Sequence, residues 1–254
     1  MADIGKVREF WDEHICGDVF TSLTDRSSEE YLAEVRRNRY RYEYHLMPFL
    51  RRVVAAANGG RVLEIGCSMG MDTAELARLG AQVVGVDLSP KSIEVARRHF
   101  QIAGLQAELR VANAESLDFP DASFAAVYSF GVLHHTPDID KAIAEVHRVL
   151  RPGGRAFLML YTRYSLNNLV HVLLRIPYES PRDWKADAPV TQTFSKRELR
   201  QLLRNFEDLR IEKRYLFGAG WRPLSDVVPQ FLNDALGRVA GWHWMIEARK
   251  PASR

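Results

Sequence analysis

The feature that most constrains the fold lies between residues 60 and 160, where short apolar runs alternate regularly with amphipathic helical runs. Each short run has the length of a strand that is buried on both faces, and each helical run is long enough to connect two parallel strands. This alternation is typical of an α/β fold with a doubly wound, mainly parallel sheet. The expected strands of this zone are 61–65, 82–86, 109–111, 125–129 and 156–160.

Local signals predict where helices begin and end. Gly80 is expected to end the first helix of this zone as its C-terminal cap. Ser89 is expected to be the N-cap of the next helix, with Pro90 in its first turn. A third helix is expected from about Ile139 to Leu150, followed by a turn at 152–154.

Composition excludes several classes of protein. The chain has 254 residues, 46% hydrophobic and 26% charged, which is ordinary for one large globular domain or a domain with a small cap. No stretch approaches the ~20 apolar residues that span a bilayer, and the acidic first twenty residues do not resemble a signal peptide. The two cysteines form no metal-ligand spacing, and a net charge of +3 gives no reason to expect nucleic acid. We therefore expect a cytoplasmic chain without a metal site or stable membrane insertion, and we leave the oligomeric state open.

The loop after the first expected strand is the first candidate for a binding site. It carries Gly66 and Gly70, and the next strand ends at Asp87. Ligands of such sheets lie beyond the carboxyl ends of the strands, where a carboxylate commonly binds the ribose hydroxyls. The Gly-x-x-x-Gly spacing disfavours a nicotinamide dehydrogenase, which needs Gly-x-Gly-x-x-Gly. Taken alone, the same residues are also compatible with a tight turn and a helix cap.

Five segments, in this order along the chain, resemble the motifs of class I S-adenosylmethionine-dependent methyltransferases. They are VLEIGCSMG at 62–70, VGVDLS at 84–89, NAESLDFP at 113–120, VLHHTPD at 132–138 and LRPGG at 150–154. The motif region covers about 100 of the 254 residues. The resemblance implies a Rossmann-like, seven-stranded sheet, S-adenosyl-L-methionine as cofactor, and methyl transfer to an oxygen, nitrogen or carbon atom of a small molecule.

The resemblance also assigns roles in cofactor binding. It implies that the backbone from Gly66 to Ser68 follows the methionine moiety, that Asp87 binds the ribose, and that Leu88 flanks the adenine. Ser68 stands where the family usually has glycine, and Asn113 stands where it usually has aspartate. The full implied set is Glu64, Gly66, Cys67, Ser68, Gly70, Asp87, Leu88, Asn113, Ala114 and Ser129.

A catalytic base is implied by the turn after the fourth strand, which points toward the methyl end of the cofactor in this family. Methyl transfer mainly requires the nucleophile and the methyl group to be held roughly 3–3.5 Å apart, and a base helps only if the acceptor must lose a proton. His134 is the candidate base, with His135 as second choice. The alternative is that both histidines stabilise the turn by hydrogen bonding to the backbone.

The flanking regions are expected to complete the molecule around this core. The predicted division is a helical N-terminal lid at 1–57, the cofactor-binding core at 58–160, and a cap inserted after strand five followed by C-terminal completion of the same domain at 161–254. Ser195 and Glu198 form a capping-box pattern at the start of a late helix. The last two strands, near 209–211 and 243–247, are expected to be antiparallel.

Several residues of the flanks have two interpretations. Six arginines lie between Tyr31 and Arg52 among four tyrosines, either as contacts to an anionic acceptor or as the solvated face of a helix. Cys16 is expected to be a packing residue rather than a nucleophile. The cap supplies three candidates for the acceptor pocket that are equally compatible with a core or interface role: His171, Tyr178 and Trp184.

Two functions from different classes therefore compete. The first is a small-molecule methyltransferase. The second is a cofactor-binding protein of the same fold that isomerises or cyclises its substrate without transferring a methyl group. Conversion of the cofactor to S-adenosylhomocysteine distinguishes them.

Overall fold

A computed structural model describes residues 3–179, 187–218, 221 and 224–252. Its centre is one sheet in which seven strands run in the order β3-β2-β1-β4-β5-β8-β7, and a short strand, β6, pairs with β5. The order reverses between β1 and β4, which is the arrangement of a doubly wound fold. The predicted fold class is confirmed.

The predicted strands of the central zone are all present and parallel to one another. Most of their apolar residues are buried, because helices cover both faces of the sheet; Val111, on the edge strand, is exposed. The strands are β1 (Arg61–Ile65), β2 (Gln82–Asp87), β3 (Glu108–Val111), β4 (Phe124–Phe130), β5 (Leu150–Thr162), β6 (Thr193–Phe194), β7 (Glu207–Arg214) and β8 (His243–Arg249).

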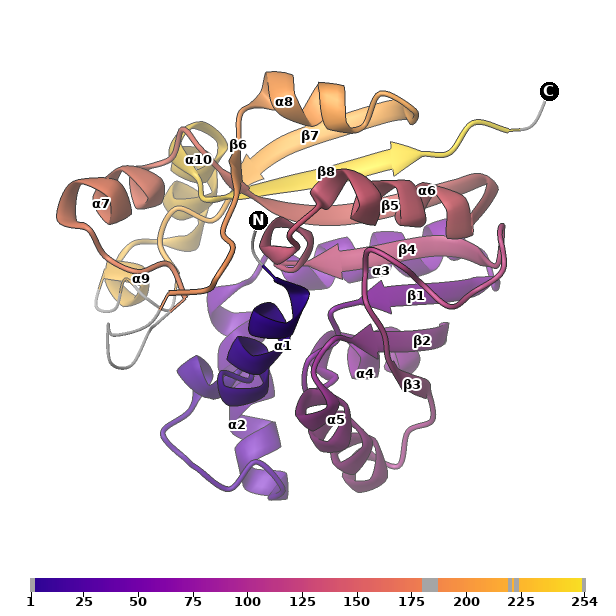
Figure 1. Cartoon of the computed structure of the whole chain (residues 1–254). Coiled ribbons are helices and arrows are strands. Elements are labelled where there is room, and N and C mark those ends of the chain that lie inside the picture. Colours follow the sequence, from indigo (N-terminus) through magenta and orange to yellow (C-terminus); the bar gives the residue numbers. More distant parts are fainter. Residues whose placement is uncertain (1–2, 180–186, 219–220, 222–223, 253–254) are drawn as a thin grey trace.

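Two layers of helices enclose the sheet (Figure 1). One layer consists of α3 (Leu46–Ala57), which packs against β1, β4 and β5, and of α4 (Met71–Arg78) and α5 (Pro90–Ala103), which pack against β2 and β3. The opposite layer packs α6 (Ile139–Val149) and α8 (Lys196–Leu202) against the largest apolar cluster. The predicted caps are confirmed: Ser89 accepts a hydrogen bond from Ser92, and Ser195 forms a capping box with Glu198.

The N-terminal segment packs over the loop that follows β1. It contains α1 (Ile4–Glu13), a short 3-10 helix η1 (Asp18–Phe20) and α2 (Glu29–Tyr42). Apolar residues of η1 and α2 form a cluster with Met69 and Met71 of that loop region. Figure 1 shows α1 and α2 beyond the arrowheads of β1 and β2, whereas α3 lies against the sheet itself. The division into lid, core and cap stays a prediction.

Strand β5 differs from the expectation for its first residues. The segment 152–154, predicted as a turn before the strand, lies within β5, because Leu150 already pairs with Phe124. This segment keeps two features of a turn. The pairing between β4 and β5 shifts register here, and Gly153 has a positive φ of 75°. Strand β6 was predicted only as the start of a helix, and its two residues are too few to carry a strand pattern.

The C-terminal region completes the sheet and adds three helices at one end of it. Strand β8 is antiparallel to both β5 and β7, so the predicted antiparallel final pair is confirmed. The helices at this end are α7 (Leu166–Leu174), α9 (Leu224–Val227) and α10 (Gln230–Ala240). Within the described ranges, no helix has both the length and the apolar composition needed to cross a membrane.

Candidate active site

A cavity of about 930 Å³ lies at the carboxyl ends of β1, β2 and β4. This is where the strand order reverses, which is the usual ligand position in open α/β sheets. Its walls come from the loop after β1, from α1 and η1, from one side of α7, and from the segment that follows α7.

The cavity brings together most of the residues predicted to bind the cofactor. Gly70 and Ser129 are the two exceptions. Gly70 is the N-cap of α4, and the buried Ser129 hydroxyl donates to the carbonyl of Ile65 at 3.0 Å. The eight that line the cavity are Glu64, Gly66, Cys67, Ser68, Asp87, Leu88, Asn113 and Ala114.

The loop after β1 requires glycine at its first turn. Gly66 has a φ of 80°, and a Cβ atom there would lie 2.1 Å from Cγ2 of Val132. Ser68 adopts a φ of 46°, a left-handed conformation that glycine adopts more readily. Its hydroxyl donates to the carbonyl of Cys16 at 3.2 Å, which ties the loop to the N-terminal segment.

Asp87 is held by two backbone donors at the end of β2. Its two oxygens accept hydrogen bonds from the amides of Ser89, at 2.9 Å, and Ser68, at 2.8 Å. Burial raises the pKa of Asp87 to about 6, although both amide hydrogen bonds act in the opposite direction. Each carboxylate oxygen has a second lone pair, so this group fits a pair of ribose hydroxyls as further donors.

A buried ionic cluster forms the cavity wall between α2 and α4. Asp72 accepts hydrogen bonds from the Arg39 guanidinium and from the hydroxyls of Tyr40 and Tyr128, at distances of 2.7 to 3.2 Å. Burial alone would raise the pKa of Asp72, but Arg39 and the two hydroxyls outweigh it and hold the pKa below its usual range. Arg39 also lies 3.1 Å from Glu43, whose pKa burial raises to about 7.

Carboxylates outnumber cations around this part of the cavity. Burial, and next the charge of Asp72, raise the pKa of Glu64 well above its usual range. Among the described lining residues, Arg39 is the single arginine or lysine, against the carboxyl groups of Glu43, Glu64, Asp72 and Asp87. An acidic surplus in a buried site favours a ligand with positive charge, and the sulfonium and amino groups of S-adenosylmethionine meet that requirement.

His135 lies in the cavity wall beside a carboxylate from the segment that follows α7. Its Nδ1 atom lies 2.7 Å from the carbonyl of Val190, and its Nε2 atom lies 3.5 Å from Oε1 of Glu179. The hydroxyl of Tyr161 donates to the same Glu179 oxygen at 2.6 Å. A carbonyl can only accept, so Nδ1 carries the ring proton and Nε2 of the neutral imidazole carries a lone pair.

His134, the predicted base, is fully buried and is not among the residues that line the cavity. Its ring centroid lies 3.9 Å from that of Tyr161, and neither ring nitrogen has a hydrogen-bond partner among the described residues. Burial, and next the neighbouring His135 and His243, hold the pKa of His134 well below its usual value. Its catalytic role stays a prediction, but the geometry favours His135.

Aromatic side chains from the region after β5 and from Trp242, just before β8, line the cavity; two of them, His171 and Tyr178, are predicted candidates. Tyr178 is parallel to Trp242, and the ring of Trp242 stacks on Tyr161 with a centroid distance of 4.1 Å. His171 also lines the cavity, whereas Trp184 lies outside the described residues. Cys16 also lines the cavity and is exposed there, so it is not the packing residue that the sequence predicted.

Sequence reasoning missed Glu43, Asp72 and Glu179. Glu43 is the C-cap residue of α2 and Asp72 belongs to α4, both outside the recognised motif positions, and their pairing through Arg39 joins residues far apart in the chain. The nearest signal was the density of arginines in the N-terminal segment, of which Arg39 lines the cavity. Glu179 lies in an irregular segment with no local pattern.

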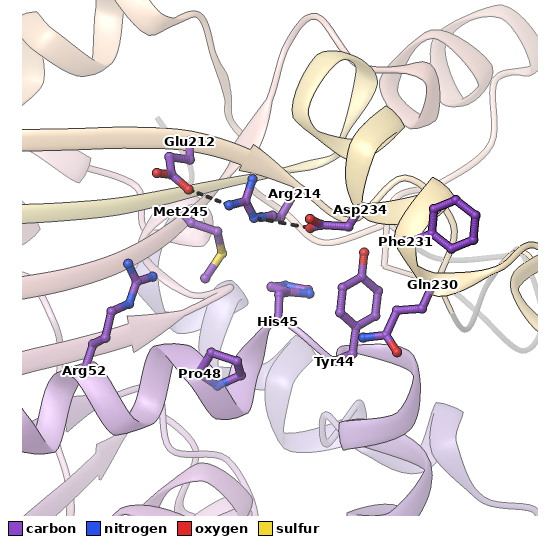
Figure 2. Close-up of a pocket in the computed structure, with 10 residues that line it drawn as sticks. All are labelled: Tyr44, His45, Pro48, Arg52, Glu212, Arg214, Gln230, Phe231, Asp234 and Met245. Atoms are coloured by element: carbon purple, nitrogen blue, oxygen red, sulfur yellow. Dashed lines mark hydrogen bonds and ion pairs between the residues drawn. The ribbon is translucent and has the colours of Figure 1, made fainter.

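A second pocket, of about 770 Å³, lies between α3, β7 and α10 (Figure 2). Figure 2 shows Arg214 between Glu212 and Asp234, with His45 and Tyr44 facing it from the start of α3. Nε2 of His45 lies 3.1 Å from Nδ1 of His243, which lines the first cavity. The two pockets are therefore separated by one buried pair of imidazoles.

Comparison with known proteins agrees with this geometry. Residues 63–158 match the family described as "Methyltransferase domain". The ubiquinone biosynthesis O-methyltransferase of Methylocella silvestris is 31% identical over 219 residues, which cover 82% of each protein. The protein of the same name from Xanthomonas axonopodis pv. citri is 42% identical over 106 residues, and the match spans 41% of this chain and 44% of that relative.

Solved structures share the fold. The cyclase SpnF is 19% identical with a TM-score of 0.64, and the match covers 97% of this chain and 96% of that one. Phosphoethanolamine N-methyltransferase 2 of Haemonchus contortus, solved with S-adenosylhomocysteine, is 18% identical with a TM-score of 0.65 and coverages of 96% and 60%. At such identities the likeness concerns the fold alone, so the likeness to a cyclase does not favour cyclisation.

The relative from Methylocella silvestris matches across most of both chains, and the predicted cofactor residues converge on one cavity at the switch point of the sheet. The chain therefore belongs to the class I S-adenosylmethionine-dependent methyltransferases, and it is an enzyme that transfers a methyl group from S-adenosylmethionine to a small molecule.

Proposed function

We propose that the acceptor atom is a hydroxyl oxygen on a planar, largely apolar small molecule, and that His135 is the general base. The observation that carries this proposal is the orientation of His135. The Val190 carbonyl fixes the protonated Nδ1 on one side, so the lone pair of Nε2 is directed toward Glu179 at the cavity wall. An oxygen nucleophile must lose a proton during the reaction, and a positioned imidazole suits that task at neutral pH.

Glu179 and Tyr161 assist this base. S-adenosylmethionine supplies a methyl group on a sulfonium, so no protein group has to activate the electrophile. His135 becomes a cation when it takes the acceptor proton, and the Glu179 carboxylate at 3.5 Å stabilises that charge. Tyr161 holds the carboxylate in place through its hydroxyl.

The aromatic side chains of the cap support a planar acceptor. Tyr161, Trp242 and Tyr178 form a stack with ring centroids 4.1 and 5.8 Å apart, and all three line the cavity. Aromatic rings favour offset stacking with other flat rings at such distances. The names of the relatives, ubiquinone biosynthesis O-methyltransferases, also support oxygen as the acceptor atom.

The remaining predictions fit this proposal. We propose that Gly66 to Ser68, Asp87, Leu88, Asn113 and Ala114 bind the cofactor in the roles that the resemblance implies, and that α1 and η1 act as a lid. We also propose the cytoplasm as the compartment, because both cysteines are free thiols, as is usual in a reducing environment.

The proposal is tested by supplying methyl-labelled S-adenosylmethionine with hydroxyarenes and with matched aromatic amines. Hydroxyarenes are expected to yield labelled ethers, and His135→Gln is expected to lower turnover by ~10²–10⁴-fold with cofactor affinity unchanged. Methylation of the amines alone would overturn the proposal of an oxygen acceptor. Full activity of His135→Gln together with an inactive, folded His134→Gln would return the role of base to His134.

A further inference from the structure

Large apolar side chains gather at one end of the molecule. In the described part of the chain, twelve large hydrophobic residues are exposed, and all of them except Val111 lie on or beside α7, α9 and α10. We call these residues the apolar end: Tyr164, Leu169, Val172, Leu173, Leu174, Leu224, Val227, Phe231, Leu232, Leu236 and Val239. Single exposed apolar residues are normal, but such a concentration marks an interaction surface.

The three helices are neighbours in space. The ammonium group of Lys213 donates to the carbonyl of Tyr164 at 2.7 Å and to that of Val239 at 2.9 Å, which joins the start of α7 to the end of α10. The indole of Trp221, just before α9, donates to Asn167 of α7 at 2.8 Å. Figure 1 shows α7, α9 and α10 together at one end of the sheet.

Helix α7 has the composition of a helix in a membrane interface. No charged residue occurs from Tyr164 to Leu174, and none of its residues is buried. A helix on a water-facing surface normally presents a polar stripe to solvent. Instead, α7 exposes Leu169, Val172, Leu173 and Leu174.

Charge at the ends of α7 favours an anionic partner. Arg163 and Arg175 flank the helix, and both are exposed. Arg163 is ion-paired with Glu198, whereas Arg175 has no ion pair among the described residues. Arginines at the ends of an apolar helix place their guanidinium groups at the level of phospholipid phosphates.

The same helix is a wall of the active-site cavity. Asn167, Val170 and His171 face the cavity, while the leucines face outward. Whatever covers the outer face of α7 is therefore separated from the cavity by this one helix. An apolar phase at this position would supply an apolar acceptor directly to the cavity, which a second copy of the chain would not do.

We propose that the apolar end docks on the surface of an anionic phospholipid bilayer, with α7 lying in the interface. Docking is peripheral, because the nine residues of α7 are too few to span the hydrocarbon core. The apolar side chains enter the boundary between headgroups and acyl chains, and Arg175 pairs with headgroup phosphates.

The test is co-sedimentation of the full chain with vesicles of phosphatidylcholine containing about a third phosphatidylglycerol, without cofactor or acceptor. We expect binding, and we expect the double substitution Leu173→Gln and Leu174→Gln to weaken it by about tenfold or more. Glutamine keeps a similar helix propensity, so the fold should survive. Val111→Thr is the matched control and should bind as the parent does, because Val111 is the one large hydrophobic residue among the described positions that is exposed outside the apolar end.

Two further measurements complete the test. Arg175→Gln should weaken binding to the anionic vesicles more than binding to pure phosphatidylcholine, because it removes only the charge contribution. Absence of vesicle binding by the parent chain, or equal binding by the double variant, overturns the proposal. A dimer in light scattering that the double variant dissociates, without vesicle binding, shows that a second copy covers this surface instead. These outcomes do not depend on which atom is methylated.

Discussion

At the scale of single residues, Asp87 shows how the fold prepares a side chain for a ligand. Backbone amides of Ser68 and Ser89 hold both carboxylate oxygens, so the group is oriented before any cofactor arrives. Burial raises its pKa to about 6, which places its ionisation close to the physiological range. Cofactor affinity should therefore depend on the charge of this one group.

We expect Asp87→Asn to weaken cofactor binding by tenfold or more, because each hydrogen bond to a charged acceptor contributes about 1.5–3 kcal/mol. The side-chain NH2 group of the new asparagine would also face a backbone N–H group that now donates a hydrogen bond to the carboxylate. Calorimetric titration with S-adenosylhomocysteine measures the loss. Asp140→Asn, at an exposed carboxylate of α6 that does not line the cavity, is the control, and equal affinity in parent and Asp87→Asn would contradict the assignment.

The same residue predicts a pH dependence. Ribose hydroxyls donate to the ionised carboxylate, and the folded protein protonates Asp87 as the pH falls through about 6. Cofactor affinity should therefore be constant above that pH and decline below it. In Asp87→Asn the decline should disappear, so a titration series from pH 8 to 5 on both proteins checks the source of the effect.

The sequence predicted much of this site because its residues follow strands in recognisable motifs. Eight of the ten predicted cofactor residues line the cavity, and the strand ends bring them there without any knowledge of side-chain packing. The sequence could not decide between His134 and His135, because the two residues are adjacent in a short 3-10 helix and only the directions of their side chains differ. Glu179 could not be found either, since its partner His135 lies in a distant segment.

At the scale of elements, the contact between α2 and α4 holds the N-terminal segment to the core. Two arginines of α2 reach acidic residues of α4. Arg39 pairs with Asp72 and is largely buried, with a side-chain exposure of 16%. Arg36 pairs with Glu75 and is half exposed, and Glu75 also pairs with Arg78.

These two ion pairs should differ in their effect on stability. Arg39→Met leaves Asp72 buried without its cation, which should lower the free energy of unfolding by about 3 kcal/mol or more. Arg36→Met should cost less than about 1 kcal/mol, because Arg36 is half exposed and its buried partner Glu75 keeps its ion pair with Arg78. Urea unfolding of the ligand-free variants measures both, and equal losses would show that burial is not the deciding factor.

Element boundaries were predicted where a local residue type controls them. The caps at Ser89 and Ser195 are examples, because a serine hydroxyl satisfies a helix amide within three residues. Strand β6 and the start of β5 were not predicted, because their pairing depends on neighbours far away in the chain. The positions of α7 and α10 beside each other likewise depend on Lys213, which belongs to neither helix.

At the scale of the whole molecule, three buried histidines link stability to pH. His134, His45 and His243 are all buried, and burial lowers the pKa of each, to about 3 for His45. The unfolded chain accepts protons at these residues near pH 6.5, whereas the folded chain does not. Protonation of these three residues therefore stabilises the unfolded state relative to the folded state as the pH falls below 6.5.

These histidines lower the free energy of unfolding as the pH falls from 6.5 to 5, whereas Glu43, Glu64 and Asp87, whose pKa values burial raises, act in the opposite direction. The histidine contribution is therefore measured as the difference between the parent and a variant that lacks one of them. A single histidine with so low a folded pKa contributes a slope of up to about 1.4 kcal/mol per pH unit in this window. His45→Gln keeps a polar group beside His243 but cannot titrate, so its curve should be less steep. Urea unfolding at pH 7, 6 and 5 measures the slopes, and identical slopes would assign the effect to other groups.

The attachment of α1 has a kinetic consequence. Asp12 of α1 accepts a hydrogen bond from Ser89 at 2.6 Å near the ribose site, and Trp11 of α1 contacts His135 at the other end of the cavity. Only Val7 and Phe10 of this helix are buried, whereas α2 is fastened by the ion pair of Arg39. If α1 acts as the proposed lid, we expect exchange of spent for fresh cofactor to proceed by detachment of α1 while α2 stays in place. The frequency of that detachment would then set an upper limit on turnover, independent of how fast the methyl group moves.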